Sequence, residues 1–215
     1  LLQNSVNRNP KMKAIKKDNR IHLKDTQIGN YTNQITHISK AVMRLTKLQQ
    51  FYMGNSPLLA ENICTDWIDP NSEYAKKYAA DELDWEKMTE LTDIELYNCP
   101  KLTTLPDFLY EIPEMQVLNI ACCRGIDGLN GTKDSTGDQL TEDWKRLATP
   151  DKCKSAKKIQ ILYMSYNNLV NFPTGCLHNM EKLGLLDCMS NKIETLQPFG
   201  KDVKLTQLNL NYNKI

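Results

Sequence analysis

The sequence predicts an α/β repeat fold: a solenoid with a curved parallel sheet on its concave face and short helices or turns on its convex face. Two observations predict this fold. A pattern of apolar residues that ends in a small polar residue or a cysteine recurs along most of the chain. Uninterrupted copies lie 22 to 24 residues apart. A fixed period of that length is the signature of an architecture built by stacking similar units.

The pattern is clearest at residues 205–215, "LTQLNLNYNKI", which reads L-x-x-L-x-L-x-x-N-x-I. Alternate side chains of the L-x-L core point into the stack, so those places must be apolar. At the N place the chain leaves the strand, and a small polar side chain there can bind backbone groups that the turn leaves without partners. These are the features of a leucine-rich repeat. The predicted ladder of such side chains is Thr26, Ser56, Cys99, Cys123, Asn167, Asn191 and Asn213.

A second pattern lies between the strands and predicts helical turns on the convex face. Its clearest copy, residues 105–112, reads L-P-x-x-L-x-x-I, and looser copies start at Ile38 and Phe172. Apolar residues three or four apart lie on one side of a helical turn. We therefore expect one short helical segment in each of these units.

The repeats occupy residues 20–215, after a polar and basic segment at 1–19 that we interpret as a linker or the edge of a preceding domain. Two insertions, at about 57–87 and about 127–155, interrupt the period, and all three tryptophans lie in them. We expect each tryptophan to pin its insertion against the solenoid, with ligand stacking as the alternative. A solenoid end needs a polar cap, and none follows the last repeat, so we expect the domain to be truncated at its C-terminal end.

Composition argues against several classes of function. The net charge is +1, which does not favour broad attraction to nucleic acid. No apolar run approaches the ~20 residues that span a bilayer. The seven cysteines show no disulfide framework. Free thiols usually indicate a reducing compartment, although an exported protein of an anaerobic organism fits equally. Cys99, Cys123 and Cys188 occupy buried repeat places, whereas Cys64, Cys122, Cys153 and Cys176 are harder to place.

Binding is expected on the concave sheet, whose outward strand places form a continuous surface. The register aligns a central row that starts at His22 and continues through one residue of each later strand. Tyrosine offers a large contact area with a polar tip, and a surface of tyrosines, acids and amides suits a protein or glycan partner. An inert spacer that presents other domains is the alternative. The candidate ligand-binding residues are Tyr52, Glu95, Tyr97, Asn119, Tyr163, Asp187 and Asn209.

The sequence does not predict an enzyme. Nucleophile-elbow, nucleotide-loop and zinc-protease motifs are absent. Glu95 and Asp187 are expected four strand spacings apart, about 19 Å, whereas glycosidase carboxylates are ~5–9.5 Å apart. The adjacent Cys122 and Cys123 invite a metal or redox interpretation, but the three histidines are scattered. We predict no metal and no cofactor.

The chain resembles leucine-rich-repeat proteins of gut Bacteroides-type bacteria in the stretches 24–57, 91–126, 158–173 ("KIQILYMSYNNLVNFP") and 180–196 ("MEKLGLLDCMSNKIETL"). The resemblance implies a large exported protein at the cell surface or outer membrane, with a signal peptide and a lipid anchor upstream. It also implies a domain of unknown function before the repeats, more repeats after residue 215, and a role in binding or adhesion. It implies no catalytic residue. Cys122 departs from the pattern, because a single cysteine is expected there.

Overall fold

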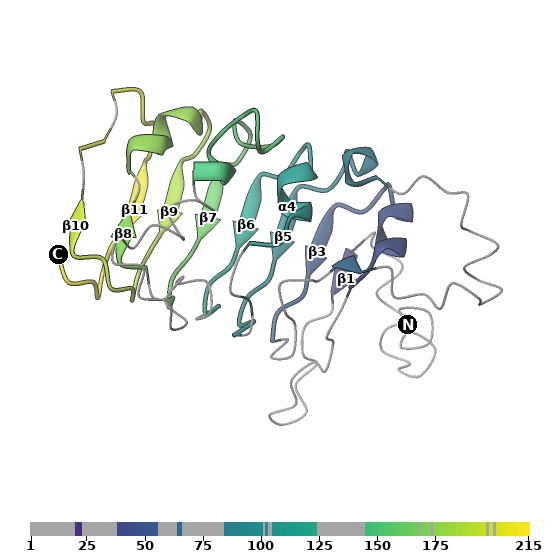
Figure 1. Ribbon diagram of the computed structural model, residues 1–215, viewed down its shortest axis with the longest axis horizontal. Helices are drawn as coiled ribbons and strands as arrows, with labels where there is room; N and C mark the ends of the chain where they lie inside the picture. Colours follow the sequence, from purple (N-terminus) through teal and green to yellow (C-terminus); the bar gives the residue numbers. More distant parts are fainter. Residues whose placement is uncertain are drawn as a thin grey trace.

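A row of parallel strands forms the frame of the molecule. In this computed structural model, seven short strands pair in chain order, each parallel to the next (Figure 1). This arrangement confirms the predicted solenoid with a parallel sheet on one face. The strands are β1 (Arg20–His22), β3 (Gln50–Tyr52), β5 (Asp93–Glu95), β6 (Val117–Asn119), β7 (Ile161–Tyr163), β9 (Leu185–Asp187) and β11 (Gln207–Asn209). The structure describes residues 20–22, 38–55, 64–65, 84–100, 102, 105–123, 145–167, 169–172, 174–196, 198–199 and 201–215.

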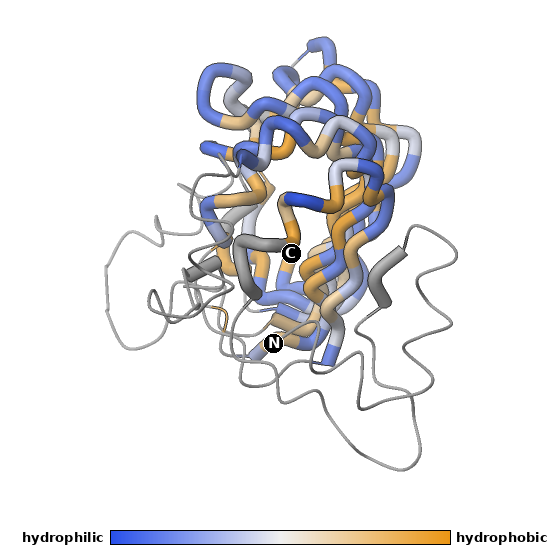
Figure 2. The backbone as a smooth tube through the Cα atoms, turned by 90° about the vertical axis from the view of Figure 1, so that its right-hand side faces the viewer, coloured by the Kyte–Doolittle hydropathy of each residue, from blue (hydrophilic) through white to orange (hydrophobic). Residues whose placement is uncertain are grey.

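The core is a stack of side chains from the middle of each strand. Strand partners are Phe51 with Ile94, Ile94 with Leu118, Leu118 with Leu162, and Leu162 with Leu186, and each of the five is at most 1% exposed. Their neighbours on β3 to β9 are only partly buried, which gives the alternation expected of a sheet with one solvent face. Figure 2, seen along the stack, shows the same alternation of hydrophobic and hydrophilic segments. Burying each such side chain stabilises the fold by roughly 1.5–3 kcal/mol.

The convex side is made of short helical turns and two small pairs of strands. The turns are η2 (Lys40–Arg44), η3 (Trp85–Lys87), α4 (Phe108–Glu111) and η5 (Thr174–Asn179). The strand pairs are β2 (Ile38–Ser39) with β4 (Cys64–Thr65), and β8 (Asn171–Phe172) with β10 (Thr195–Leu196). The sequence predicts the helical turns but not these pairs, because a two-residue strand is too short to show a period. No helix in the described part of the chain is long and apolar enough to cross a membrane.

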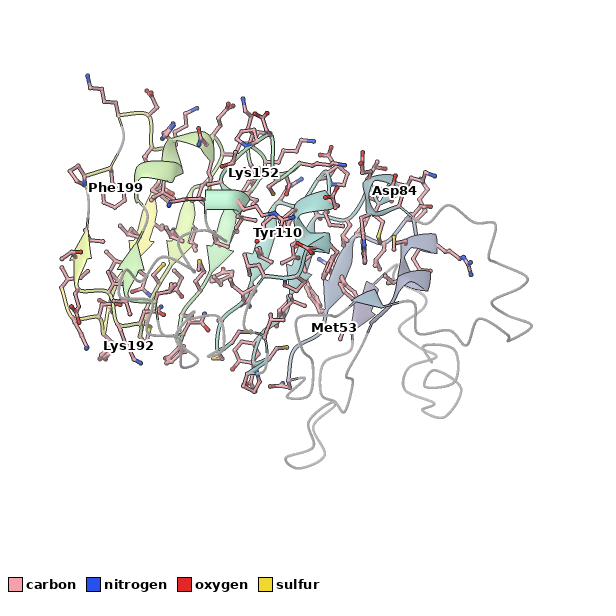
Figure 3. All side chains as sticks on the ribbon, viewed as in Figure 1. Met53, Asp84, Tyr110, Lys152, Lys192 and Phe199 are labelled. Atoms are coloured by element: carbon pink, nitrogen blue, oxygen red, sulfur yellow. The ribbon has the colours of Figure 1, made fainter. Side chains whose placement is uncertain are left out.

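Parts of both predicted insertions belong to the stack. Trp85 is only 8% exposed, and its ring centroid lies 4.6 Å from that of Phe108, so this tryptophan pins its segment to the core as expected. Near the end of the second insertion, Cys153 is buried, and the N–H of Lys154 donates to the carbonyl of Tyr110 at 3.0 Å. Figure 3 shows Tyr110 inside the solenoid, with Asp84 and Lys192 at its margins. Trp67 and Trp144 lie outside the described residues.

Candidate functional site

A ladder of buried asparagines holds neighbouring repeats in register. The Asn191 amide donates to the carbonyl of Cys188 in its own repeat at 2.9 Å and to that of Met164 in the preceding repeat at 3.1 Å. Its oxygen accepts from the N–H of Leu169 at 3.0 Å. Each bond meets a backbone group at the turn, and consecutive ladder asparagines share a carbonyl, because Asn167 also donates to that of Met164 and Asn213 to that of Cys188. The same pair of donations recurs at Asn167 and Asn213.

Cysteines take the ladder place in the two preceding described repeats. The Cys99 thiol donates to the Met53 carbonyl at 3.4 Å, and the Cys123 thiol donates to the Leu96 carbonyl at 2.9 Å. The hydrogen bond with the Cys99 side chain, and then burial, raise the pKa of Cys123 well above its usual value. Burial likewise raises the pKa of Cys188. Cys123 and Cys188 therefore stay protonated at physiological pH, and the ladder thiols Cys99 and Cys123 act as small buried donors. Thr26 and Ser56 lie outside the described residues.

From Asn55 onward, the residue before each ladder place has a left-handed backbone, which costs an L-residue roughly 1–2 kcal/mol. In this conformation the backbone N–H of the residue donates a hydrogen bond to a carbonyl of the next repeat. For example, Cys122 donates to the carbonyl of Ser165 at 2.9 Å, and Tyr166 donates to that of Met189 at 2.8 Å. The residues, with φ between 54° and 60°, are Asn55, Asn98, Cys122, Tyr166, Ser190 and Tyr212.

The predicted central row lies on the sheet in the predicted register. Strand partners are His22 and Tyr52, Tyr52 and Glu95, Glu95 and Asn119, Asn119 and Tyr163, Tyr163 and Asp187, and Asp187 and Asn209. The separation expected for the two carboxylates needs correction. Glu95 and Asp187 are three strand intervals apart, not four, or about 14 Å at the usual strand spacing. This estimate is still longer than the ~5–9.5 Å of a glycosidase pair.

Three members of the row make a local bond that explains their identity without a ligand. A side-chain oxygen of Asn119, Asp187 and Asn209 accepts from the backbone N–H two residues later, at 3.0, 3.0 and 3.1 Å respectively. Short polar side chains often bind nearby backbone in this way. A tyrosine at the same place, such as Tyr163, cannot substitute for this acceptor so close to the backbone. Tyr163 is therefore a member of the row whose identity this local bond does not explain.

Three of the predicted residues come together around one shallow hollow of about 220 Å³ at the carboxyl ends of β5, β6 and β7 in the middle of the sheet. We call it the tyrosine hollow. The other lining residues, which the sequence analysis missed as site residues, face it from the end of the strand and from the left-handed place. Tyr52, Glu95, Asp187 and Asn209 lie outside it. The hollow is lined by the predicted Tyr97, Asn119 and Tyr163, and by Ala121, Cys122, Ser165 and Tyr166.

The chemistry of the hollow is neutral and partly apolar. Tyr97 and Tyr166 are 37% and 46% exposed, so their rings are available to a partner. The Cys122 side chain raises the pKa of the Tyr97 phenol, first by charge repulsion in its ionised form and then by its hydrogen bond, and burial adds to the effect. Tyr97 is therefore a neutral hydroxyl at physiological pH.

The two adjacent cysteines have different roles. Cys122 is a half-buried free thiol at the hollow, whereas Cys123 is buried in the ladder. Within the described ranges, no group of three histidine, cysteine, aspartate or glutamate side chains is arranged to hold a metal ion. Cys64 and Cys176 have no described side chains.

Comparison with known proteins identifies the kind of repeat protein. No protein-family model matches the sequence, and no curated protein matches it. A crystal structure of a leucine-rich repeat protein from Bacteroides thetaiotaomicron matches 99% of this chain at 58% identity and a TM-score of 0.75. One from Bacteroides eggerthii matches 99% of it at 52% identity and a TM-score of 0.74. The chain spans 24% and 33% of the lengths of these two proteins. It is a leucine-rich repeat protein of the Bacteroides type.

Proposed function

We propose that the chain is a non-catalytic binding module that engages a protein or glycan partner through its concave sheet. The tyrosine hollow is the observation that carries this proposal. Three tyrosines from two repeats surround it: Tyr97 follows β5, whereas Tyr163 and Tyr166 belong to the repeat of β7. Tyr97 and Tyr166 are more than a third exposed. Tyrosine is enriched at interfaces because it combines a large apolar ring with a hydrogen-bonding tip. Nothing in the packing of the core requires these rings to face solvent.

The alternative function is a spacer that presents other domains and has no ligand of its own. The local backbone bonds of Asn119, Asp187 and Asn209 favour the spacer, because they explain why these three places carry short polar side chains without any ligand. The two functions differ in what they require of the tyrosines. A spacer tolerates their removal, whereas a binding module does not.

A screen of glycan and host-protein arrays separates these functions. The chain is compared with a variant in which Tyr52, Glu95, Tyr163 and Asp187 are all alanine. Lost binding with an unchanged melting temperature supports the binding module. No binding by the folded chain supports the spacer, and binding that the four alanines leave intact contradicts a partner on the concave sheet.

We further propose that the chain is part of an exported protein at the cell surface, held by a lipid anchor. The resemblance to Bacteroides repeat proteins supports this location, and the free thiols are compatible with an anaerobic setting. Protease shaving of intact cells tests it. Release of peptides from this chain by external protease supports the location, and protection until lysis contradicts it.

A further inference from the structure

The concave face carries acidic charge but no basic charge from β3 to β11. Each of these six strands gives three outward places: its first residue, its third residue, and the residue two positions after the third. These eighteen places include three carboxylates, Asp93, Glu95 and Asp187, and no lysine, arginine or histidine. The whole chain has 27 lysines and arginines and a net charge of +1. The acidity of this face is therefore a local property.

Basic side chains instead form ion pairs away from the concave face. Lys47 pairs with Glu90 at 2.6 Å, and Lys157 pairs with Glu181 at 2.8 Å. Among the described residues, no such pair includes Asp93 or Asp187. One oxygen of Asp187 accepts from the N–H of Met189, which leaves its second oxygen for a partner. Asp93 and Asp187 are therefore not paired with a lysine or arginine in the part of the chain that the structure describes.

The acidic strands flank the tyrosine hollow. Glu95 lies on β5 and Asp187 on β9, and the hollow residues Asn119 and Tyr163 occupy the two strands between them. The hollow's volume of about 220 Å³ is below the ~300–1,000 Å³ of a small-molecule pocket. It therefore suits a single side chain better than a whole ligand. A cation is attracted to the face of a tyrosine ring, and the flanking carboxylates favour the same charge.

The protein itself contains this combination on its convex side. The guanidinium of Arg146 lies 3.7 Å from the centroid of the Tyr110 ring and donates to the Asp107 carboxylate at 2.6 Å. The concave face presents the tyrosines and the carboxylates but not the arginine. A partner would supply it.

We infer that the partner is a positively charged protein segment, and that one of its arginine or lysine side chains enters the tyrosine hollow between Glu95 and Asp187. The inference rests on the proposed function and names the class of partner. Glu95 and Asp187 are about 14 Å apart by strand spacing, and an extended segment advances about 3.3 Å per residue. Two cationic residues four positions apart along the segment would therefore reach both carboxylates.

The test uses fluorescent nine-residue peptides of glycine and serine with arginine at three positions, each two apart, so that the middle arginine faces the hollow and the outer two reach the carboxylates. Matched peptides carry glutamate or glutamine at the same positions, and binding is measured by fluorescence anisotropy with the 215-residue chain. We expect the arginine peptide to bind most tightly and to weaken as salt rises. Exposed charge pairs contribute about 0.2–1 kcal/mol each, so the double variant Glu95→Gln, Asp187→Asn should weaken binding about two- to thirtyfold.

The control variant, Asp151→Asn with Asp202→Asn, removes the same charge from exposed places outside the seven-stranded sheet. It should bind the arginine peptide as the unmodified chain does. The inference is overturned if the arginine peptide does not bind, if the neutral or acidic peptide binds equally well, or if both double variants weaken binding equally. The array screen then decides the proposed function separately: a glycan or neutral protein lost in the four-alanine variant would preserve binding by the concave face.

Discussion

Replacing Asn191 with alanine tests whether the ladder holds the repeats together. The substitution removes the donations to Met164 and Cys188 and the acceptance from Leu169. The two carbonyls keep one partner each, from Asn167 and Asn213, so they remain satisfied. The N–H of Leu169 loses the oxygen that it donates to, and the ladder place is only 7% exposed. An unsatisfied buried donor costs about 1–3 kcal/mol, and each lost bond about 0.5–1.5. The orphaned N–H and the two lost donations together give an expected loss of about 2–6 kcal/mol.

Two further variants make this prediction specific. Asn191→Cys should cost less than alanine, because a ladder thiol can still donate to a carbonyl, as Cys123 does to Leu96. Asn213→Ala should also cost less, because that side chain is half exposed and water can replace its bonds. Urea unfolding followed by circular dichroism measures all three free energies. A cysteine variant no more stable than the alanine variant, or equal losses at 191 and 213, would refute the ladder reasoning.

Further substitutions test the core, the turn and the thiols. Leu118→Ala should cost about 2–5 kcal/mol in urea unfolding, because its side chain is fully buried, whereas the outward Val117→Ala should cost under ~1. Trp85→Ala should cost about 3–5 kcal/mol, and a loss below ~1 would show that the ring does not pin its segment. Ser190→Val should lower the melting temperature by more than Ser190→Asn, because the backbone there is left-handed (φ 54°) and a β-branched residue tolerates this poorly; equal melting contradicts it. Burial raises the pKa of Cys188. The contribution of its protonated thiol to the free energy of unfolding is therefore fully present below the pKa of an unfolded cysteine, ~8.5. As the pH rises above ~8.5, this contribution declines by about 1.4 kcal/mol per pH unit. Between about pH 8.5 and 10.5 the urea midpoint should fall less steeply in Cys188→Ala, and parallel curves would rule out the thiol as a cause.

The repeat register is predictable from sequence because each strand has an inward apolar place and a ladder place at fixed spacing. Those places fix which residues align across strands, and the structure pairs Tyr52 with Glu95 and Glu95 with Asn119 in that register. The spacing pattern does not show how far an insertion extends. Residues such as Cys153 return to the core before the next strand pattern begins, and the repeat pattern does not predict this.

The tyrosine hollow is only partly predictable. The alternation of side chains along a strand predicts that Tyr97 and Tyr163 point to the concave face. Cys122 and Tyr166 lie at the turn, one residue before a ladder residue, and the alternation does not predict which way their side chains point. Their side chains reach the hollow because the backbone turns left-handed there. Asparagine at residues 55 and 98 is the sequence signal for this turn, since asparagine tolerates the left-handed region. Cysteine at 122 and tyrosine at 166 do not favour the left-handed region, so the sequence does not predict the turn at these two places.

The most direct test of concave-face binding uses Cys122, a half-buried thiol that already lines the hollow. The rate of its alkylation by iodoacetamide is measured by peptide mass spectrometry, with and without a saturating partner from the array screen. The account predicts that the bound partner slows alkylation of Cys122 and leaves the melting temperature unchanged or higher. An unchanged rate at full occupancy would place the partner elsewhere and contradict the account.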